Sequence, residues 1–440
     1  RRLGNSLASI FKQDNHHSVY VGRDCRLSSP LFAEALKEGL LCAGINVFEL
    51  GMTTTATLNY AIHHGGQSDC GVMVTASHNP REYNGFKIII RDKVMAGETL
   101  QRIKVQMHQE SIYSGASGQE ASQRLTTKYL QRIAQDCRVK PGFKIVVDAG
   151  NGAAGPLAVE LFERLGCNLI PLFCNPDGAF PNHDPNPSDE ANLQQLIETV
   201  VSTQSDIGFA FDGDGDRLVV ISGDGEIIWP DKLMMIFAKE ILRDNEDAKI
   251  VFDVKSSCLL ERLVLKHSGI PVMCKTGHAH VRQAVKESKA VLGGEFSGHI
   301  FFNDRWDGFD DGLYAATRLL EILSADDMDK HPIRSRLQNI LKDLDESIYT
   351  PELLIPVCET EKFNLMETLI KNCQFKDANI ITIDGLRVEY LHGWGLIRAS
   401  NTSANLTLRF EADNEQELER IQKLFHDQLS PFIKNLDHYI

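Results

Sequence analysis

Two polar stretches, far apart in the sequence, carry side chains that are suited to chemistry. Thr75–Pro80 reads Thr-Ala-Ser-His-Asn-Pro and puts a hydroxyl in a tight turn, whereas Asp212–Arg217 presents three glycine-spaced carboxylates followed by a guanidinium. A serine that carries a phosphoryl group needs a cation to neutralise the phosphate, and a hard divalent cation needs oxygen ligands. The two stretches together predict a phosphoserine beside a magnesium site. The predicted ligands are Ser77, Asp212, Asp214 and Asp216.

Each stretch also has a purely structural interpretation. Ser-His-Asn-Pro is good turn chemistry, because Asn and Ser bond their own backbone and Pro fixes φ, and the turn alone leaves both interpretations open. The aspartate loop resembles the start of a calcium loop, but Arg217 and Gly223 stand where that loop needs Gly and Glu. Carboxylates between two strand-like runs, 207–211 and 218–221, are costly without a cation. The metal site is therefore favoured, and the absence of Cys and His from the loop favours magnesium over zinc.

Three further segments offer groups for catalysis or binding. Lys87 and His299 are candidates for general acid–base chemistry, although a lone His is more often structural and the sequence assigns neither role. Arg217 is a candidate contact for the transferring phosphate, with a surface salt bridge as the alternative. The run 398–402 offers a guanidinium, two hydroxyls, an amide and loop N–H groups, a density of donors that suits a phosphate dianion. Its alternative is a polar turn before a strand.

These motifs occur in order across nearly the whole chain, and in that order the chain resembles the α-D-phosphohexomutase family. The closest resemblance is to its bacterial phosphomannomutase/phosphoglucomutase branch. The matching segments are Thr75–Pro80, Asn84–Lys87, Asp212–Arg217, Gly294–His299 and Arg398–Thr402. The resemblance implies an isomerase that interconverts hexose 6-phosphate and hexose 1-phosphate of mannose, glucose or both. It implies a phosphoserine enzyme, Mg²⁺, and a hexose 1,6-bisphosphate as intermediate and activator.

The resemblance also implies roles for individual residues. Ser77 carries the phosphoryl group, His78 orients the serine loop, and Glu295 and Ser297 bind sugar hydroxyls in both orientations of the sugar. Lys87 and His299 are implied near the reacting hydroxyl. The implied substrate-binding residues are Arg217, Lys255, His278, Glu295, Ser297, Arg398, Ser400, Asn401 and Thr402.

Three alternative functions stay open at this point. A phosphoglucosamine mutase is one, although that branch tends to carry glutamine where this chain has Phe296, which favours mannose and glucose phosphates. A serine-nucleophile metallophosphatase is another alternative. Such enzymes generally bind zinc with mixed His and Asp ligands, and this chain lacks such a set. A non-catalytic sugar-phosphate sensor would have lost the serine or the aspartates, and this chain has them all.

Composition limits the partners and the compartment. The formal net charge of −14 argues against nucleic acid and anionic membranes as partners. The resemblance implies small-molecule sugar phosphates, whose negative charge requires Arg and Lys to gather in a cleft with the acidic residues outside it. Ten cysteines without a C-x-x-C pair are typical of reduced thiols. We find no signal peptide and no apolar run near the length of a membrane span, so the expected location is cytoplasmic.

With 440 residues, the chain is long enough for several domains. Alternating strand and helix patterns predict an α/β fold with three similar mixed α/β domains and a C-terminal α+β domain around a central active-site cleft. The expected domains are 1–123 with the serine loop, 124–224 with the metal loop, 225–344 with the sugar-recognition loop and 345–440 with the phosphate-binding loop.

Some expectations concern single elements. The glycine-rich turn 149–155 lacks either nucleotide-binding spacing, and we expect it to be a structural connection. The charged stretch 330–348 is expected to be a linker, and helices are expected to begin at Ser257 and Val281. Asp413 and Gln416 predict a capping box for the last helix.

Overall fold

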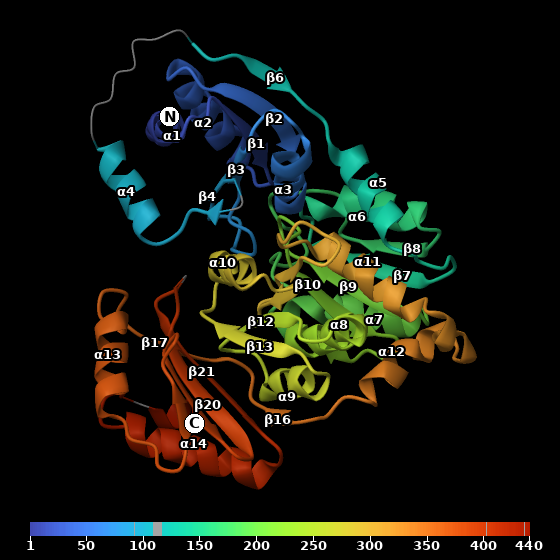
Figure 1. The fold of residues 1–440 in the computed structure, drawn as a ribbon, viewed down its shortest axis with the longest axis vertical. Coiled ribbons are helices and arrows are strands. Elements are labelled where there is room, and N and C mark those ends of the chain that lie inside the picture. Colours follow the sequence, from blue (N-terminus) through green and yellow to red (C-terminus); the bar gives the residue numbers. More distant parts are fainter. Residues whose placement is uncertain (92, 109–116, 402, 435) are drawn as a thin grey trace.

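A computed structural model describes the chain except residues 92, 109–116, 402 and 435. In the described part, four β-sheets follow one another along the sequence. The first and last units lie at opposite ends of the long axis, and the second and third lie between them and to one side (Figure 1).

The first unit has the sheet order β5-β4-β3-β1-β2-β6. Its strands are β1 (Ser18–Arg23), β2 (Asn46–Met52), β3 (Cys70–Val74), β4 (Phe86–Ile90), β5 (Lys93–Val94) and β6 (Glu120–Ser122). Its helices are α1 (Arg2–Gln13), α2 (Ser29–Cys42), α3 (Thr55–His64) and α4 (Glu98–Met107).

The second unit has the order β11-β10-β9-β7-β8, and the third has β13-β12-β14-β15. The second contains α5 (Thr126–Asp136), β7 (Lys144–Asp148), α6 (Ala154–Arg164), β8 (Asn168–Leu172), the 3₁₀ helix η1 (Glu190–Leu193), α7 (Gln194–Ser202), β9 (Ile207–Phe211), β10 (Leu218–Ser222) and β11 (Ile227–Ile228). The third contains α8 (Pro230–Asp244), β12 (Lys249–Asp253), α9 (Cys258–Lys266), β13 (Ile270–Cys274), α10 (His278–Ser288), β14 (Leu292–Gly294), β15 (Ile300–Phe302), α11 (Gly312–Leu323), η2 (Asp326–Lys330) and α12 (Ile333–Leu341).

The C-terminal unit is an antiparallel sheet, in which β20 is paired on both sides. Its elements are β16 (Ile348–Tyr349), β17 (Leu353–Pro356), α13 (Lys362–Asn372), β18 (Asn379–Ile381), β19 (Leu386–Tyr390), β20 (Gly393–Ala399), β21 (Asn405–Ala412), α14 (Glu415–Leu429) and η3 (Leu436–His438). The expected fold class, three similar α/β units and a C-terminal α+β unit, is confirmed.

The first three units share one strand pattern. In each, three parallel strands pair with the first of them in the middle, and a fourth strand runs antiparallel to the third. The corresponding sets are β3-β1-β2 with β4, β9-β7-β8 with β10, and β14-β12-β13 with β15. The loop between the third and fourth strands therefore has the same place in each unit. These three loops contain Ser77, the aspartates 212–216 and the segment 295–299.

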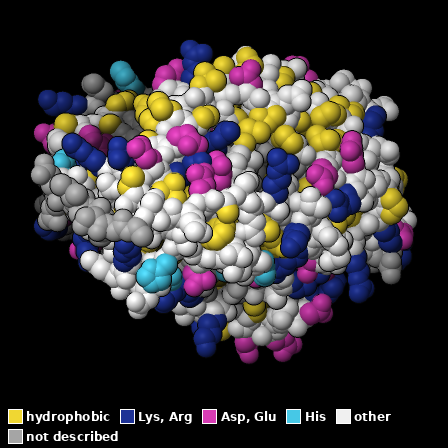
Figure 2. All heavy atoms as spheres, turned by 90° about the horizontal axis from the view of Figure 1, so that it is seen from above, with side chains coloured by type: hydrophobic (Ala, Val, Ile, Leu, Met, Phe, Trp, Pro, Cys, Tyr) yellow, Lys and Arg dark blue, Asp and Glu magenta, His cyan; other side chains and the backbone are white. Residues whose placement is uncertain are grey.

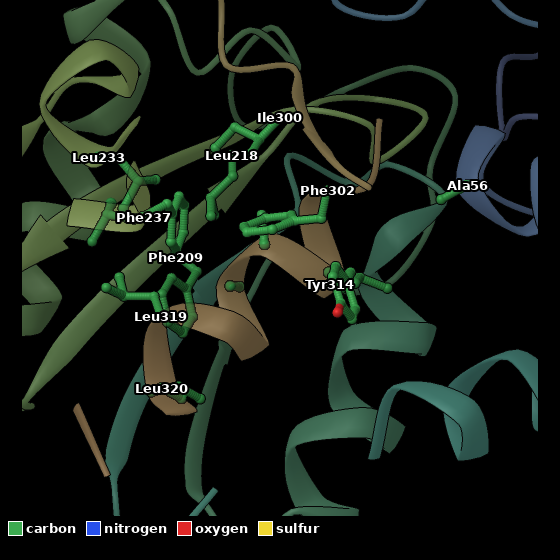
Figure 3. Close-up of a cluster of buried hydrophobic side chains, with 14 of the residues drawn as sticks. Ala56, Phe209, Leu218, Leu233, Phe237, Ile300, Phe302, Tyr314, Leu319 and Leu320 are labelled. Atoms are coloured by element: carbon green, nitrogen blue, oxygen red, sulfur yellow. The ribbon is translucent and has the colours of Figure 1, made fainter. Parts of the chain in front are cut away.

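Hydrophobic packing joins these three units most extensively, and a small cluster of Val254, Trp394 and Leu396 connects the third unit to the fourth. The largest cluster combines residues of all three, including Ala56, Phe209 and Phe302 (Figure 3). Phe302 and Tyr314 meet edge to face with ring centroids 5.3 Å apart. The C-terminal unit has its own cluster between its sheet and α13 and α14. The first three units therefore share one hydrophobic core, and this core fixes the relative positions of the three loops that contain Ser77, the aspartates and the segment 295–299.

Several local expectations were wrong. The stretch 330–348 is not merely a linker, because α12 forms within it and buries Leu337 and Leu341. The cap of α14 is Asn414, whose side chain accepts a hydrogen bond from the Glu417 N–H, so the predicted capping box is one residue out of register. Helix α10 begins at His278, three residues before the expected start.

The surface agrees with a protein of mixed charge. On the face drawn in Figure 2, basic and acidic side chains are interspersed and hydrophobic side chains gather in the upper part of the view, so the excess acid forms no single patch there. No helix among the described residues is both long and apolar enough to cross a membrane.

Asp311 caps α11 from the core, which predicts a pH-dependent stability. Its carboxylate accepts hydrogen bonds from the Tyr314 N–H and the Tyr129 hydroxyl, and burial raises its pKa from 3.8 to about 7. The unfolded chain releases this proton first, so wild type loses stability as pH rises from about 4 to about 7. Because Asn caps equally well, we expect Asp311→Asn to raise the melting temperature by a few degrees at pH 8 and little at pH 4. An equal shift at both pH values would contradict this.

Candidate active site

The serine loop follows β3 and faces the second unit. Ser77 is nearly buried, adopts a left-handed φ of 53°, and donates its hydroxyl to Asp212 Oδ2 at 2.7 Å. His78 Nδ1 lies 3.3 Å from the same hydroxyl. Burial, together with the nearby cations Arg217, His299 and Lys87, lowers the pKa of His78 to about 2, so its ring is neutral. The structure thus brings together the serine and the aspartate loop, 135 residues apart in sequence.

The aspartate loop is shaped by its own backbone. The N–H groups of Asp216 and Arg217 donate to Asp212 Oδ1 at 3.1 and 3.2 Å, which curls the loop around that carboxylate. Gly215 has a φ of 74°, a conformation that favours glycine. A Cβ on Gly213 would lie 2.5 Å from the Ser77 carbonyl oxygen, so glycine there allows the two loops to meet.

Three carboxylates in this loop are completely buried, and one lysine compensates them in part. Lys87 Nζ donates to Asp214 Oδ2 at 2.6 Å and also to Asp216. Burial disfavours its charge, but the carboxylates outweigh burial and hold the pKa of Lys87 well above its usual value. Burial, with the charges of Asp216 and Asp214, raises the pKa of Asp212 to about 8. At Asp212 the effects of burial and of the neighbouring carboxylates therefore outweigh those of the two nearby cations, Lys87 and Arg217.

The three buried carboxylates fit a divalent cation. One oxygen each of Asp212, Asp214 and Asp216 lie within 4.8 Å of one another. The buried Oδ1 atoms of Asp214 and Asp216 have no hydrogen-bond partner among the described residues. An all-oxygen set of carboxylates suits a hard ion such as magnesium.

A second buried group, made by Asp216, His299 and Asp310, also has the spacing of metal ligands. However, Arg217 Nε donates to His299 Nε2 at 3.1 Å. Because Arg has no acceptor, this bond places the imidazole proton on Nδ1, which lies 2.8 Å from Asp310 Oδ2. A protonated Nδ1 cannot bind a metal, so the group is a His–Asp pair. Burial lowers the pKa of His299, but Asp216 and Asp310 more than offset that effect and raise it above its usual value.

The third loop presents the candidate sugar-recognition residues. Glu295 is 2% exposed and accepts the Gly277 N–H at 2.7 Å with one oxygen, while its other oxygen has no partner among the described residues. Ser297 lies half-buried two residues on. The His278 ring lies 5.4 Å from that of His299, and burial lowers its pKa to about 4.

The remaining candidates lie where the third and fourth units meet. Lys255 Nζ pairs with Glu352 at 3.0 Å. Arg398 Nε donates to Asp384, which also accepts the Thr276 N–H. In the same loop the Ser403 N–H donates to Ser400 Oγ, Asn401 is exposed, and Thr402 lies outside the described residues. No hydrogen bond among the described residues joins the 398–401 segment to Ser77 or to the aspartate loop.

The sequence-based analysis missed three residues of this site. Thr55 donates its hydroxyl to Asp214 Oδ2 and its N–H to the Asp214 carbonyl. Asp310 pairs with His299, whereas its neighbour Asp311 caps α11. Arg26 donates a hydrogen bond to the Ser77 carbonyl in the serine loop. Adjacent acids at 310 and 311 were a usable signal for the His–Asp pair, whereas no local pattern marks Thr55 or Arg26.

Comparison with known proteins covers the whole chain. Family profiles described as the α/β/α domains I, II and III and the C-terminal domain of phosphoglucomutase/phosphomannomutase match residues 1–114, 127–225, 229–343 and 354–428. A phosphomannomutase/phosphoglucomutase of Pseudomonas aeruginosa is 45% identical over 428 residues, which cover 97% of this chain and 90% of that protein. A phosphoglucomutase of Neisseria gonorrhoeae is 43% identical over 427 residues, covering 96% and 91% of the two chains.

The fold has a close counterpart among solved structures. A phosphoglucomutase/phosphomannomutase family protein from Burkholderia thailandensis superimposes with a TM-score of 0.91 and 41% sequence identity. The superposition covers 99% of this chain and 93% of that protein, so it includes all four units.

Proposed function

The chain belongs to the phosphoglucomutase/phosphomannomutase family, and from this premise we propose how its residues perform the reaction. It is an isomerase that interconverts hexose 6-phosphate and hexose 1-phosphate through a phosphoserine enzyme and a hexose 1,6-bisphosphate. We propose glucose and mannose phosphates as the substrates. The distance of 2.7 Å between the Ser77 hydroxyl and Asp212 carries the assignment of the reacting groups to these residues.

In the active state Ser77 carries the phosphoryl group. A sugar hydroxyl attacks the phosphorus, and the new O–P bond forms as the Ser77 Oγ–P bond breaks. The hydroxyl proton passes to a protein base, and a protein acid supplies a proton to the Ser77 oxygen. After the bisphosphate turns around, the reverse transfer returns the other phosphoryl group to Ser77. Such transfer depends on positioning and charge neutralisation more than on covalent activation. Lys87 and His299 are the proposed acid and base.

The buried acidic cluster can hold a metal ion, and we propose that the ion is Mg²⁺. Asp212, Asp214 and Asp216 would hold it together with a phosphate oxygen on Ser77, and when bound it neutralises phosphate charge. Lys87 holds two of these carboxylates in place, and Arg217 is positioned by His299 beside the same loop. A hexose 1,6-bisphosphate is the proposed activator, because it restores a phosphoserine that has been lost.

Recognition must work for both orientations of the sugar. We propose that Glu295 and Ser297 bind the sugar hydroxyls, because Glu295 Oε2 has no partner among the described residues and the half-buried Ser297 offers a hydroxyl two residues on in the same loop. Arg398, Ser400, Asn401 and Thr402 are the proposed contacts of the phosphate that is not transferred. Lys255 and His278 are proposed to lie near the substrate. We propose the domains 1–123, 124–224, 225–344 and 345–440 around a central cleft, with ten free thiols favouring a cytoplasmic location.

A coupled assay tests this function. Glucose 1-phosphate or mannose 1-phosphate is supplied with Mg²⁺ and a trace of the matching 1,6-bisphosphate, and formation of the 6-phosphate is followed together with inorganic phosphate. We expect stoichiometric isomerisation with negligible phosphate release. Steady phosphate release would indicate a metallophosphatase, no turnover would indicate a sensor, and preference for glucosamine 1-phosphate would indicate the neighbouring branch.

The His–Asp pair predicts a specific pH effect. Removing the Asp310 charge makes protonation of His299 less favourable, so the His299 pKa falls. We expect Asp310→Asn to lower kcat by roughly 10- to 100-fold, with little change in KM, and to move the acidic limb of the kcat–pH profile to lower pH. Asp311→Asn, at the adjacent position, should leave that limb unchanged. A limb that stays in place in Asp310→Asn would remove His299 from proton transfer.

A further inference from the structure

Arg26, in the loop between β1 and α2, is a buried cation. Its side chain is fully buried, and among the described residues its one carboxylate partner is Asp24, which accepts from Nε at 3.0 Å. A buried guanidinium is costly unless its donors are satisfied. Arg26 satisfies its remaining donors with four main-chain carbonyls, all of them in one loop. The acceptors are Ser77 O at 2.8 Å, Asn79 O at 2.6 Å, Pro80 O at 2.7 Å and Tyr83 O at 3.2 Å.

The four carbonyls are that of the reactive serine itself and those of three residues that follow it in the loop. All four carbonyl oxygens point to the Arg26 guanidinium, which therefore holds the backbone of the serine loop in one conformation. The Ser77 hydroxyl has a different partner, Asp212, to which it donates. The left-handed φ of Ser77 is unfavourable for a residue with a Cβ, so surrounding contacts must hold it. The bond from Arg26 Nη2 to the Ser77 carbonyl is a direct contact of this kind.

Arg26 also contacts the unit that carries the carboxylates. Its Cζ lies 5.1 Å from the centroid of the Phe180 ring, and its backbone forms a β-bridge with Gly178. Both partners belong to the second unit, as do the three aspartates. One side chain thus touches both halves of the site, the serine loop and the unit that bears the metal loop.

We infer that Arg26 is a positioning residue for phosphoryl transfer, which sets the Ser77 hydroxyl relative to the aspartate loop without touching substrate. This inference rests on the proposed role of Ser77. A misplacement of the reacting oxygen slows transfer, whereas the recognition residues in the third and fourth units are unchanged. Loss of Arg26 therefore acts on kcat and not on KM.

Lysine is a revealing replacement, because it keeps the charge but offers three donors from a single nitrogen in place of a planar five-donor fork. We expect Arg26→Lys to lower kcat by about 30-fold or more, with KM within about threefold of wild type. Arg336→Lys is the matched control, because Arg336 is also buried and donates to the Leu323 and His331 carbonyls, away from this site. At a similar loss of melting temperature, the control should keep its kcat.

Chemical rescue separates positioning from folding. In Arg26→Ala, millimolar guanidinium chloride should restore serine phosphorylation from glucose 1,6-bisphosphate, measured by intact-protein mass, and sodium chloride at equal ionic strength should not. Rescue by both salts, or a kcat loss in Arg336→Lys equal to that in Arg26→Lys, would overturn the inference, as would full kcat in Arg26→Lys. Ser77→Ala is measured in parallel. An active Ser77→Ala enzyme rejects the proposed function itself, whereas an inactive one beside a fully active Arg26→Lys rejects only the role of Arg26.

Discussion

Ser77→Ala is expected to lower kcat by about 10⁴-fold or more, because it removes the oxygen that carries the phosphoryl group between the two half-reactions. The remaining site still binds sugar phosphates, but without Ser77 Oγ no bond can form to the phosphorus. The fold should survive, since the hydroxyl makes one strong hydrogen bond, to Asp212, and the serine loop keeps its carbonyl contacts with Arg26. The melting temperature should therefore stay within a few degrees of that of wild type.

The measurement uses two readouts on the same protein. Turnover of glucose 1-phosphate is followed with the bisphosphate present, and intact mass after incubation with the bisphosphate shows whether a phosphoryl group is retained. Ser202→Ala, on the exposed face of α7, is the matched control and should behave as wild type in both. Phosphoryl retention by Ser77→Ala would place the acceptor on another residue.

Much of this site could be predicted because its motifs are short and local. Ser77 lies in a loop that is typical of a phosphoserine, and the three aspartates lie in a loop that is typical of a magnesium site. The family resemblance predicts that the two loops form one site. The loops lie close together because of the strand topology, which cannot be recognised from any single motif. Each loop connects the third parallel strand of its unit to the antiparallel fourth strand, and three units with the same strand pattern turn that loop to a common centre.

What the sequence did not predict depends on contacts between distant segments. Arg26 looks like an ordinary polar residue after a strand, and only the folded chain puts four loop carbonyls around it. Asp310 and Asp311 are neighbours with separate roles, since the first faces His299 and the second caps α11. Helix α12 was missed because its charged composition hides an apolar face formed by Leu337 and Leu341.

Metal removal is the second large effect that we expect. Lys87 pairs with Asp214 and Asp216, and Arg217 Nε lies 3.7 Å from Asp212 Oδ2, so a divalent ion would neutralise the negative charge that these two cations leave on three buried carboxylates. We expect chelation of divalent cations to lower kcat by about 10³-fold, and added Mg²⁺ to restore it. A ligand at 100 times its Kd stabilises the folded chain by about 2.7 kcal/mol. Mg²⁺ should therefore raise the melting temperature of the chelated protein, which is a readout independent of turnover.

Asp214 and Asp224, on neighbouring loops, provide a test variant and a matched control for the proposed metal site. Asp214→Asn removes one buried oxygen ligand, and it should abolish most of the Mg²⁺-dependent rise in melting temperature and of the Mg²⁺-restored kcat. Asp224→Asn, on the hairpin that follows, removes a carboxylate that is 71% exposed and should retain both effects. If Mg²⁺ stabilises both variants equally, the ion binds elsewhere. In that case Lys87 and Arg217 compensate the aspartate loop, and Ser77 transfers its phosphoryl group without a metal at these carboxylates.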